Sequence, residues 1–121
     1  MIIGLDIDGV LGAIMDPLNN FYNQKHGTNF KIWDYAHHDL EKTWGCYKEE
    51  AVKVVETFYQ SPKFLTIQPI PHSQKGIWVL SRNNQFFSIT TRPESVRAAT
   101  DDFIRRNFGT LVKKVVYTGA Y

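Results

Sequence analysis

The sequence has little that would mark an exported, membrane-bound or polyanion-binding protein. Its 121 residues include a single cysteine, Cys46, so no internal disulfide can form. No apolar run approaches the roughly 20 residues that a membrane helix requires, and the start MIIGLD lacks the basic and long apolar regions of a signal peptide. A net charge of +2 gives no general attraction for nucleic acid. These absences favour a cytoplasmic protein with no membrane or nucleic-acid partner.

The composition is that of a packed globular protein. Hydrophobic residues make up 43% of the chain and charged residues 21%, which is enough apolar material for a buried core. We find no internal repeat and no low-complexity segment. A chain of 121 residues leaves no room for two ordinary domains. We therefore expect a single domain over residues 1–121.

Three apolar runs are typical of strands. Residues 2–7 form a short, nearly continuous apolar run, as expected for a strand buried on both faces. The stretch QFFSITTRP predicts a second strand that ends in Thr90, Thr91 and Arg92, and KKVVYTG predicts a third. Because helical patterns separate these runs, the order indicates an α/β fold with a narrow parallel sheet of three strands.

Helical patterns fill most of the chain between the apolar runs. One helix is predicted to begin with Asp16 as N-cap and Pro17 as its first residue, and to stop at Gly27. Residues 28–45 are aromatic and polar with weak periodicity, which favours short helices and loops. Three further helices are expected. The first begins at Tyr47 and has apolar residues at helical spacing up to Phe58, the second covers residues 73–80, and the third begins at Pro93 and ends at Gly109.

Two carboxylates and a glycine follow the first apolar run. Asp6 and Asp8 are spaced i, i+2, so both would point the same way if the extended chain continued that far. Two such charges repel each other unless a cation intervenes, and Mg²⁺ prefers oxygen ligands. Gly9 permits a sharp turn with an N–H group near a bound anion. This pattern predicts a site for Mg²⁺ and phosphate; alternatively, the aspartates only end a strand and shape a turn.

These motifs resemble those of the haloacid dehalogenase superfamily. GLDIDGVL is similar to its motif I, D-x-D-G-[TV], and FFSITTRP is similar to its motif II, an apolar strand that ends in Thr or Ser. IWDYAHHDLEKTWG and FLTIQPIPHS resemble the helical cap of the 5′(3′)-deoxyribonucleotidase-like branch, where the second stretch often ends Pro-x-Pro-Gly-Ala. Here His72 and Ser73 replace that Gly and Ala. The resemblance implies a Rossmann-like core (1–11 and 72–121) with a helical cap inserted over 12–71.

The resemblance implies Mg²⁺-dependent hydrolysis of a phosphomonoester, and the cap suggests a nucleoside monophosphate. Asp6 would be the nucleophile that forms an aspartyl-phosphate, and Asp8 the general acid and base. The Asp6 carboxylate and the Asp8 backbone carbonyl would hold the metal. The residues expected near the phosphate are Gly9, Thr90, Thr91 and Arg92, although the motif assigns Arg92 no role.

Other residues in the cap region invite functional interpretations that compete with simpler ones. Aromatic side chains at positions 33, 35 and 44 would either stack on a nucleobase or form the core of the cap; they are Trp33, Tyr35 and Trp44. The run His37, His38, Asp39 favours a surface position over a metal site, because adjacent residues do not share a helical face. Cys46 has no evident partner base, so a thiol in the cap core is preferred over a nucleophile.

Two parts of the superfamily pattern do not occur after VVYTG, where they are expected: the lysine of motif III and the acidic pair of motif IV. Lys113 and Lys114 precede that strand, and Asp101 and Asp102 fall within the preceding helix. Three interpretations stay open. A second copy or another protein supplies these charges, the chain is truncated before motifs III and IV, or it is a catalytically weak or inactive binding or regulatory module. Under each, the open edge of a narrow sheet favours a homo-oligomer.

Overall fold

The computed structural model describes residues 1–119, which belong to two compact units. Unit 1 comprises Met1–Ala13 and Gln68–Tyr121, and unit 2 comprises Ile14–Ile67. The insertion expected over residues 12–71 therefore extends beyond unit 2 at both ends. The physical reason is local pairing, because Gly12 forms an antiparallel bridge with Pro69 and the Ala13 N–H donates to the Gln68 carbonyl at 2.8 Å.

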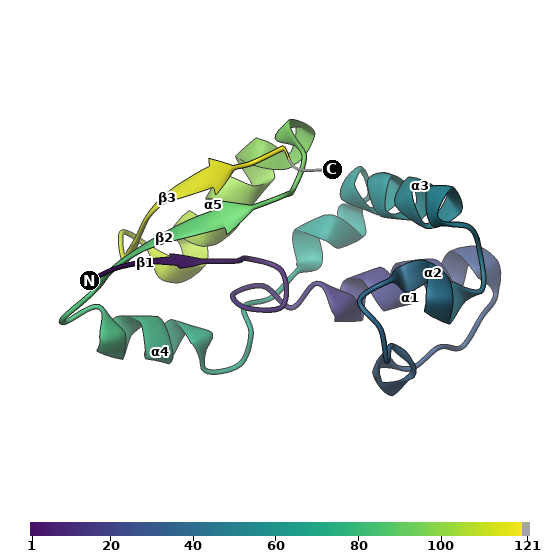
Figure 1. Ribbon diagram of the computed structural model, residues 1–121, viewed down its shortest axis with the longest axis horizontal. Coiled ribbons are helices and arrows are strands. Elements are labelled where there is room, and N and C mark those ends of the chain that lie inside the picture. Colours follow the sequence, from purple (N-terminus) through teal and green to yellow (C-terminus); the bar gives the residue numbers. More distant parts are fainter. Residues whose placement is uncertain (120–121) are drawn as a thin grey trace. The chain divides into compact units, whose positions relative to one another are not determined.

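Unit 1 contains the predicted parallel sheet. Its strands β1 (Ile2–Leu5), β2 (Gln85–Thr90) and β3 (Val112–Tyr117) lie side by side in the order β1-β2-β3 (Figure 1). Since both pairs are parallel, the carboxyl ends of all three strands meet at one edge of the sheet. The α/β architecture with a three-stranded parallel sheet is thus confirmed, and this edge is where ligands bind in such folds.

Two helices and a 3₁₀ turn complete unit 1: α4 (Ser73–Leu80), the turn Glu94–Val96 and α5 (Arg97–Phe108). The Gln74 side chain of α4 donates to the Asn107 carbonyl of α5 at 3.0 Å. Alternate residues of β2 are buried, as expected for a strand with one covered face. The buried residues of β2 and α5 are Phe86, Ser88, Thr90, Thr100, Phe103, Ile104 and Phe108.

The opposite face of the sheet is exposed in the part of the chain that the structure describes. It presents apolar side chains from all three strands, among them Ile2, Ile89 and Val116. The prediction that β1 is buried on both faces is therefore wrong, since Ile2 is 71% exposed. The reason is that the sheet face on which Ile2 lies is exposed on all three strands within residues 1–119, as Ile89 and Val116 also show.

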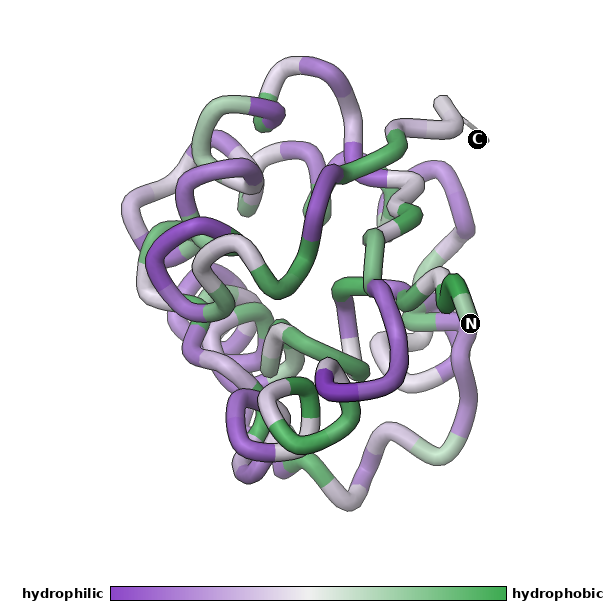
Figure 2. Tube along the Cα trace, turned by 90° about the vertical axis from the view of Figure 1, so that its left-hand side faces the viewer, coloured by the Kyte–Doolittle hydropathy of each residue, from purple (hydrophilic) through white to green (hydrophobic). Residues whose placement is uncertain are grey.

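Unit 2 is helical. It consists of α1 (Met15–His26), α2 (Leu40–Trp44), α3 (Lys48–Tyr59) and two 3₁₀ turns, Ile32–Asp34 and Pro62–Thr66. Hydrophobic and hydrophilic residues alternate along the chain trace (Figure 2). Helices α1 and α3 each bury residues at helical spacing, among them Leu18 and Tyr22 in α1 and Val54 and Phe58 in α3. The core is largely aromatic, with the Tyr22 and Trp44 rings stacked 4.1 Å apart. None of the helices within residues 1–119 has the length and hydrophobicity that crossing a bilayer requires.

Two details of these helices differ from the sequence-based expectation. Helix α1 begins at Met15, so Asp16 and Pro17 lie in its first turn instead of preceding and opening it. Gly27 ends the helix as predicted, in a left-handed conformation with φ 64°. Tyr47 caps the start of α3 but is exposed, because a cap residue lies off the periodic face of the helix that follows.

Candidate active site

The candidate site starts at the turn after β1. Ile7 and Leu11 are buried and anchor this turn in unit 1. The Ile7 carbonyl accepts the N–H groups of Val10, Leu11 and Gly12 at 3.2, 2.8 and 2.8 Å. Asp6, on the other side of Ile7 along the chain, is exposed, and its Oδ1 accepts the Ile7 N–H at 2.7 Å. The turn therefore presents the Asp6 carboxylate on a fixed backbone.

Gly9 provides the turn itself. Its φ is +83°, a backbone conformation that residues with a Cβ rarely adopt. This conformation explains why the motif has glycine at this position. The Gly9 N–H donates to the Gly12 carbonyl at 2.9 Å. The expected use of this N–H as a donor to a bound phosphate needs correction, because the turn already uses it.

The end of β2 brings Thr90 and Thr91 to the same edge. Thr90 is buried, and its hydroxyl oxygen accepts the Arg92 N–H at 3.1 Å. Thr91 is exposed. Together with Asp6 they line one pocket of about 340 Å³, which Thr118 lines as well. The structure thus brings together Asp6, to which the family resemblance assigns the role of nucleophile, and the two predicted motif II threonines.

Thr118 was not predicted to belong to the site. It follows β3, and its N–H donates to the Thr90 carbonyl at 3.0 Å, which holds it beside the end of β2. Its position directly after the third predicted strand could have indicated this location, because the residues that follow the strands of a parallel sheet meet at one edge. No motif residue marked this position.

Arg92 lies in a different place from the one expected. Its guanidinium donates from Nε to Asp8 Oδ2 at 3.1 Å and from Nη2 to Asp8 Oδ1 at 2.5 Å. Its Nη1 donates to Thr100 Oγ1 on α5 at 3.1 Å. The Arg92 side chain is only 2% exposed. The expectation that Arg92 faces the phosphate is therefore corrected, since its charge is directed at Asp8.

The oxygen ligands available for a divalent cation are limited. Within residues 1–119 no group of three or more His, Cys, Asp or Glu side chains is placed to hold a metal ion. Arg92 contacts both oxygens of the Asp8 carboxylate, so that carboxylate is not a free ligand. Mg²⁺ often binds through one carboxylate, water and substrate phosphate. The exposed Asp6 carboxylate and the Asp8 carbonyl fit a site of that kind.

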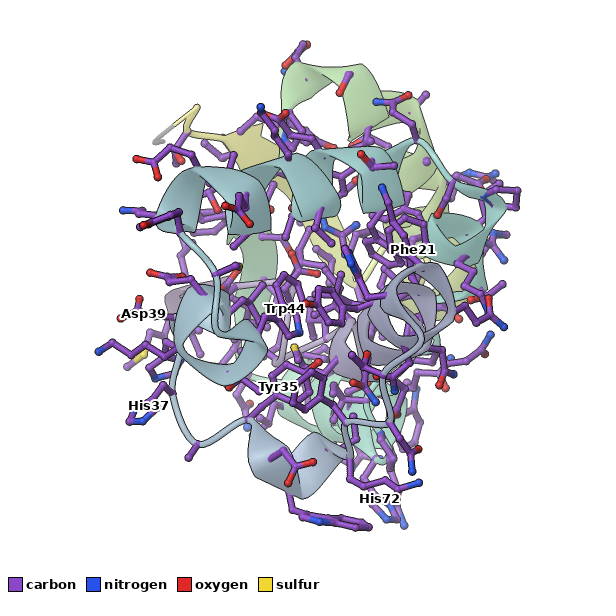
Figure 3. The ribbon with its side chains drawn as sticks, turned by 90° about the vertical axis from the view of Figure 1, so that its right-hand side faces the viewer. Phe21, Tyr35, His37, Asp39, Trp44 and His72 are labelled. Atoms are coloured by element: carbon purple, nitrogen blue, oxygen red, sulfur yellow. The ribbon has the colours of Figure 1, made fainter. Side chains whose placement is uncertain are left out.

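Two of the three cap aromatics, Tyr35 and Trp44, contact other residues of unit 2, as the core interpretation expects. The Tyr35 hydroxyl donates to Asn19 Oδ1 at 2.7 Å and accepts the Trp44 Nε1–H at 2.9 Å. Burial raises the pKa of the Tyr35 hydroxyl. Figure 3 shows Tyr35 and Trp44 directed into unit 2, and His37 and Asp39 at its periphery. Trp33 differs from the other two, because it is 80% exposed.

Cys46 is half-buried, and burial raises the pKa of its thiol. A raised pKa lowers the fraction of thiolate, the reactive form, at neutral pH. Within residues 1–119, the charged groups that act on the thiol are Glu50 and Glu41, and both raise its pKa further. This environment agrees with a thiol that packs and does not react.

Comparison with known proteins adds a family and a fold. Residues 1–114 match the family model described as 5′ nucleotidase, deoxy (pyrimidine), cytosolic type C protein. No curated protein matches the chain. A solved structure of a haloacid dehalogenase-like hydrolase from Streptococcus pneumoniae is similar, with a TM-score of 0.65 and 17% identity over 94% of this chain. At that identity the similarity shows the fold alone, and the chain spans 59% of the length of that structure.

Proposed function

Because the chain belongs to the 5′ nucleotidase, deoxy (pyrimidine), cytosolic type C protein family, a nucleotidase-like branch of the haloacid dehalogenase superfamily, we propose that it hydrolyses nucleoside monophosphates. The observation that carries this proposal is the pocket at the carboxyl edge of the sheet. There Asp6 lies with Thr90, Thr91 and Thr118, so a carboxylate nucleophile and three hydroxyl-bearing residues line the same space. A phosphate group offers acceptor oxygens that such hydroxyls can bind.

In the first half of the proposed reaction, an Asp6 carboxylate oxygen attacks the phosphorus atom. The bond from phosphorus to the leaving oxygen breaks, and its electron pair goes to that oxygen. Protonated Asp8 gives its proton to the leaving oxygen, so a nucleoside departs and Asp6 carries the phosphoryl group. The Thr90 hydroxyl would donate to a phosphate oxygen, while in this structure its oxygen accepts the Arg92 N–H.

In the second half, water attacks the phosphorus atom of the aspartyl-phosphate. The Asp8 carboxylate takes a proton from that water, and the bond to the Asp6 oxygen breaks with its electron pair returning to the carboxylate. The products are inorganic phosphate and Asp6 in its starting state. Hydrolases of this superfamily generally use Mg²⁺, which offsets the negative charge of phosphate and carboxylate when it is bound. The Asp6 carboxylate and the Asp8 carbonyl would hold it.

The test is phosphate release from a panel of nucleoside monophosphates, with Mg²⁺ and with EDTA. We expect release that requires both Mg²⁺ and Asp6, so Asp6→Asn should fall to the background rate. Asp39→Asn is the matched control, because it removes an exposed carboxylate from unit 2 and should leave the rate unchanged. If the wild-type protein releases no more phosphate than Asp6→Asn, the hydrolase proposal is wrong and the binding or regulatory interpretation takes its place.

A further inference from the structure

We infer that Arg92 and Thr100 are positioning residues that fix the orientation of the Asp8 carboxylate. The inference rests on the proposed function, in which Asp8 exchanges a proton with the leaving group and with water. Arg92 and Asp8 are 84 positions apart in the sequence, and the fold places one guanidinium against both carboxylate oxygens. The two-point contact fixes both the position of Asp8 and the plane of its carboxylate.

The chemistry of the contact favours arginine over lysine. A guanidinium is planar and presents parallel N–H donors that match the two oxygens of a carboxylate. A lysine ammonium would supply the same charge at one point and leave the carboxylate free to rotate. The two contacts with Asp8, 3.1 Å from Nε and 2.5 Å from Nη2, use only one side of the Arg92 group.

Thr100 holds the other side of that group. It is fully buried on α5, and its hydroxyl oxygen accepts the Arg92 Nη1–H at 3.1 Å. A buried donor without a partner is costly, so this bond stabilises the guanidinium in the orientation that Asp8 needs. Asp8 lies on a turn, but through Arg92 its side chain is attached to the segment that follows β2 and to the packed helix α5.

The contact leaves Asp8 able to exchange a proton. Each carboxylate oxygen has two lone-pair positions, and Arg92 occupies one on each oxygen. The Asp8 side chain is 26% exposed while Arg92 is 2% exposed, so the pair is closed on the arginine side and open on the carboxylate side. Near-attack geometry is sensitive to displacements of about 1 Å. An Asp8 that rotates freely would therefore protonate the leaving oxygen less often.

The other arginine ion pairs of unit 1 provide a contrast. Arg105 pairs with Asp102 at 2.5 Å on the surface of α5, and both side chains are exposed. Exposed pairs contribute little to stability and do not fix one geometry. Arg105→Lys is consequently a matched control for Arg92→Lys, because it makes the same chemical change on a pair outside the site.

The experiment compares two substrates in which the need for a proton differs. A nucleoside monophosphate releases an alkoxide, which must be protonated, whereas p-nitrophenyl phosphate releases a phenolate, which departs without a proton. Arg92→Lys and Thr100→Val should lower kcat/KM, which reports only the transfer of the phosphoryl group to Asp6, at least ~10-fold more for the nucleotide than for p-nitrophenyl phosphate, because general acid catalysis contributes about 10²- to 10⁴-fold. KM should change little. Thr100→Ser, which keeps the hydroxyl, should restore most of the nucleotide rate.

A second measurement requires no turnover. In arginine-selective ¹⁵N NMR spectra, the Arg92 Nε–H proton should exchange slowly with solvent in the wild-type protein and faster in Thr100→Val. Equal losses on both substrates, or unchanged Nε–H exchange in Thr100→Val, would overturn the positioning role while leaving the hydrolase proposal intact. A wild-type protein that is inactive on both substrates would overturn both proposals, and this outcome is recognised without any variant.

Discussion

At the scale of single residues, the turn before α4 holds a histidine in a backbone conformation that favours glycine. His72 has φ 70° and ψ −4°, and it is the one residue other than glycine with positive φ among residues 1–119. In the nucleotidase-like pattern that the sequence resembles, this position of the Pro-x-Pro-Gly-Ala turn is often glycine. A left-handed conformation costs a residue with a Cβ about 1–2 kcal/mol, whereas glycine adopts it readily.

We therefore predict that His72→Gly raises the free energy of unfolding by about 1 kcal/mol or less, because the larger entropy of glycine in the unfolded chain offsets part of the relieved strain. Urea denaturation of the variant and the wild-type protein measures the change. Gly27→Ala is the converse control: Gly27 has φ 64°, and among residues 1–119 none beyond its own chain neighbours comes within 4 Å of an added Cβ, so only backbone strain should destabilise that variant. A His72→Gly protein less stable than the wild type would show that the imidazole contributes more than the turn costs.

The sequence predicted those residues of the candidate site whose location depends only on where they fall relative to a strand. Asp6, Thr90 and Thr91 follow apolar runs, and parallel pairing then brings them to one edge. The role of Arg92 was not predictable, because its partners Asp8 and Thr100 are chosen by tertiary packing. The same limit applies to Gly9, whose N–H is used by a bond within the turn that no motif describes.

At the scale of elements, Tyr117 joins the end of β3 to α5. Its hydroxyl donates to Asp101 Oδ1 at 2.6 Å, and the Arg97 guanidinium lies 4.1 Å from the centre of its ring. Burial is the largest cause that raises the pKa of the Tyr117 hydroxyl, and the Asp101 carboxylate raises it further. The folded protein therefore favours the neutral hydroxyl more strongly than the unfolded chain does.

This pKa shift predicts how stability changes at high pH. A group with a raised pKa in the folded state stabilises it fully below the unfolded pKa, near 10 for tyrosine, and loses that contribution as pH rises toward the folded pKa. The wild-type protein should thus be more stable than Tyr117→Phe at pH 8, and the difference should shrink above about pH 10. Urea midpoints of both proteins across this range measure it. Tyr22 and Tyr35 are present in both proteins, so their titration affects both stabilities alike. If the stability difference between the two proteins stays the same from pH 8 to above about pH 10, the pKa shift of Tyr117 does not contribute to stability.

The elements themselves were largely predictable from their start and stop signals. Helix α4 matches its predicted range, and Gly27 and Gly109 end α1 and α5 as expected. The exposure of β1 was not predictable, because an apolar run looks the same whether or not a further layer covers that face of the sheet. Tyr35 and Trp44 were ambiguous for a related reason, since a base-binding surface and a small aromatic core use the same side chains.

At the scale of the whole molecule, the exposed face of the sheet predicts association between copies. Ile2, Ile89 and Val116 are exposed apolar residues on the three strands, and the outer edge of β1 is unpaired within residues 1–119. Contiguous apolar surface and open strand edges favour contacts between chains. We predict that sedimentation velocity over an about hundredfold range of concentration shows reversible association, which follows mass action.

Val116→Lys should weaken this association, because a charge on the exposed face must lose water when two copies meet there. Val52→Lys is the matched control, since Val52 is 38% exposed on α3 of unit 2 and Val116 is 36% exposed on β3 of unit 1. Both variants place lysine at a partly exposed valine, so they should cost similar folding stability. Equal association of the two variants would mean that another surface joins the copies, and a wild-type protein that stays monomeric throughout would contradict the prediction that the open sheet face drives self-association.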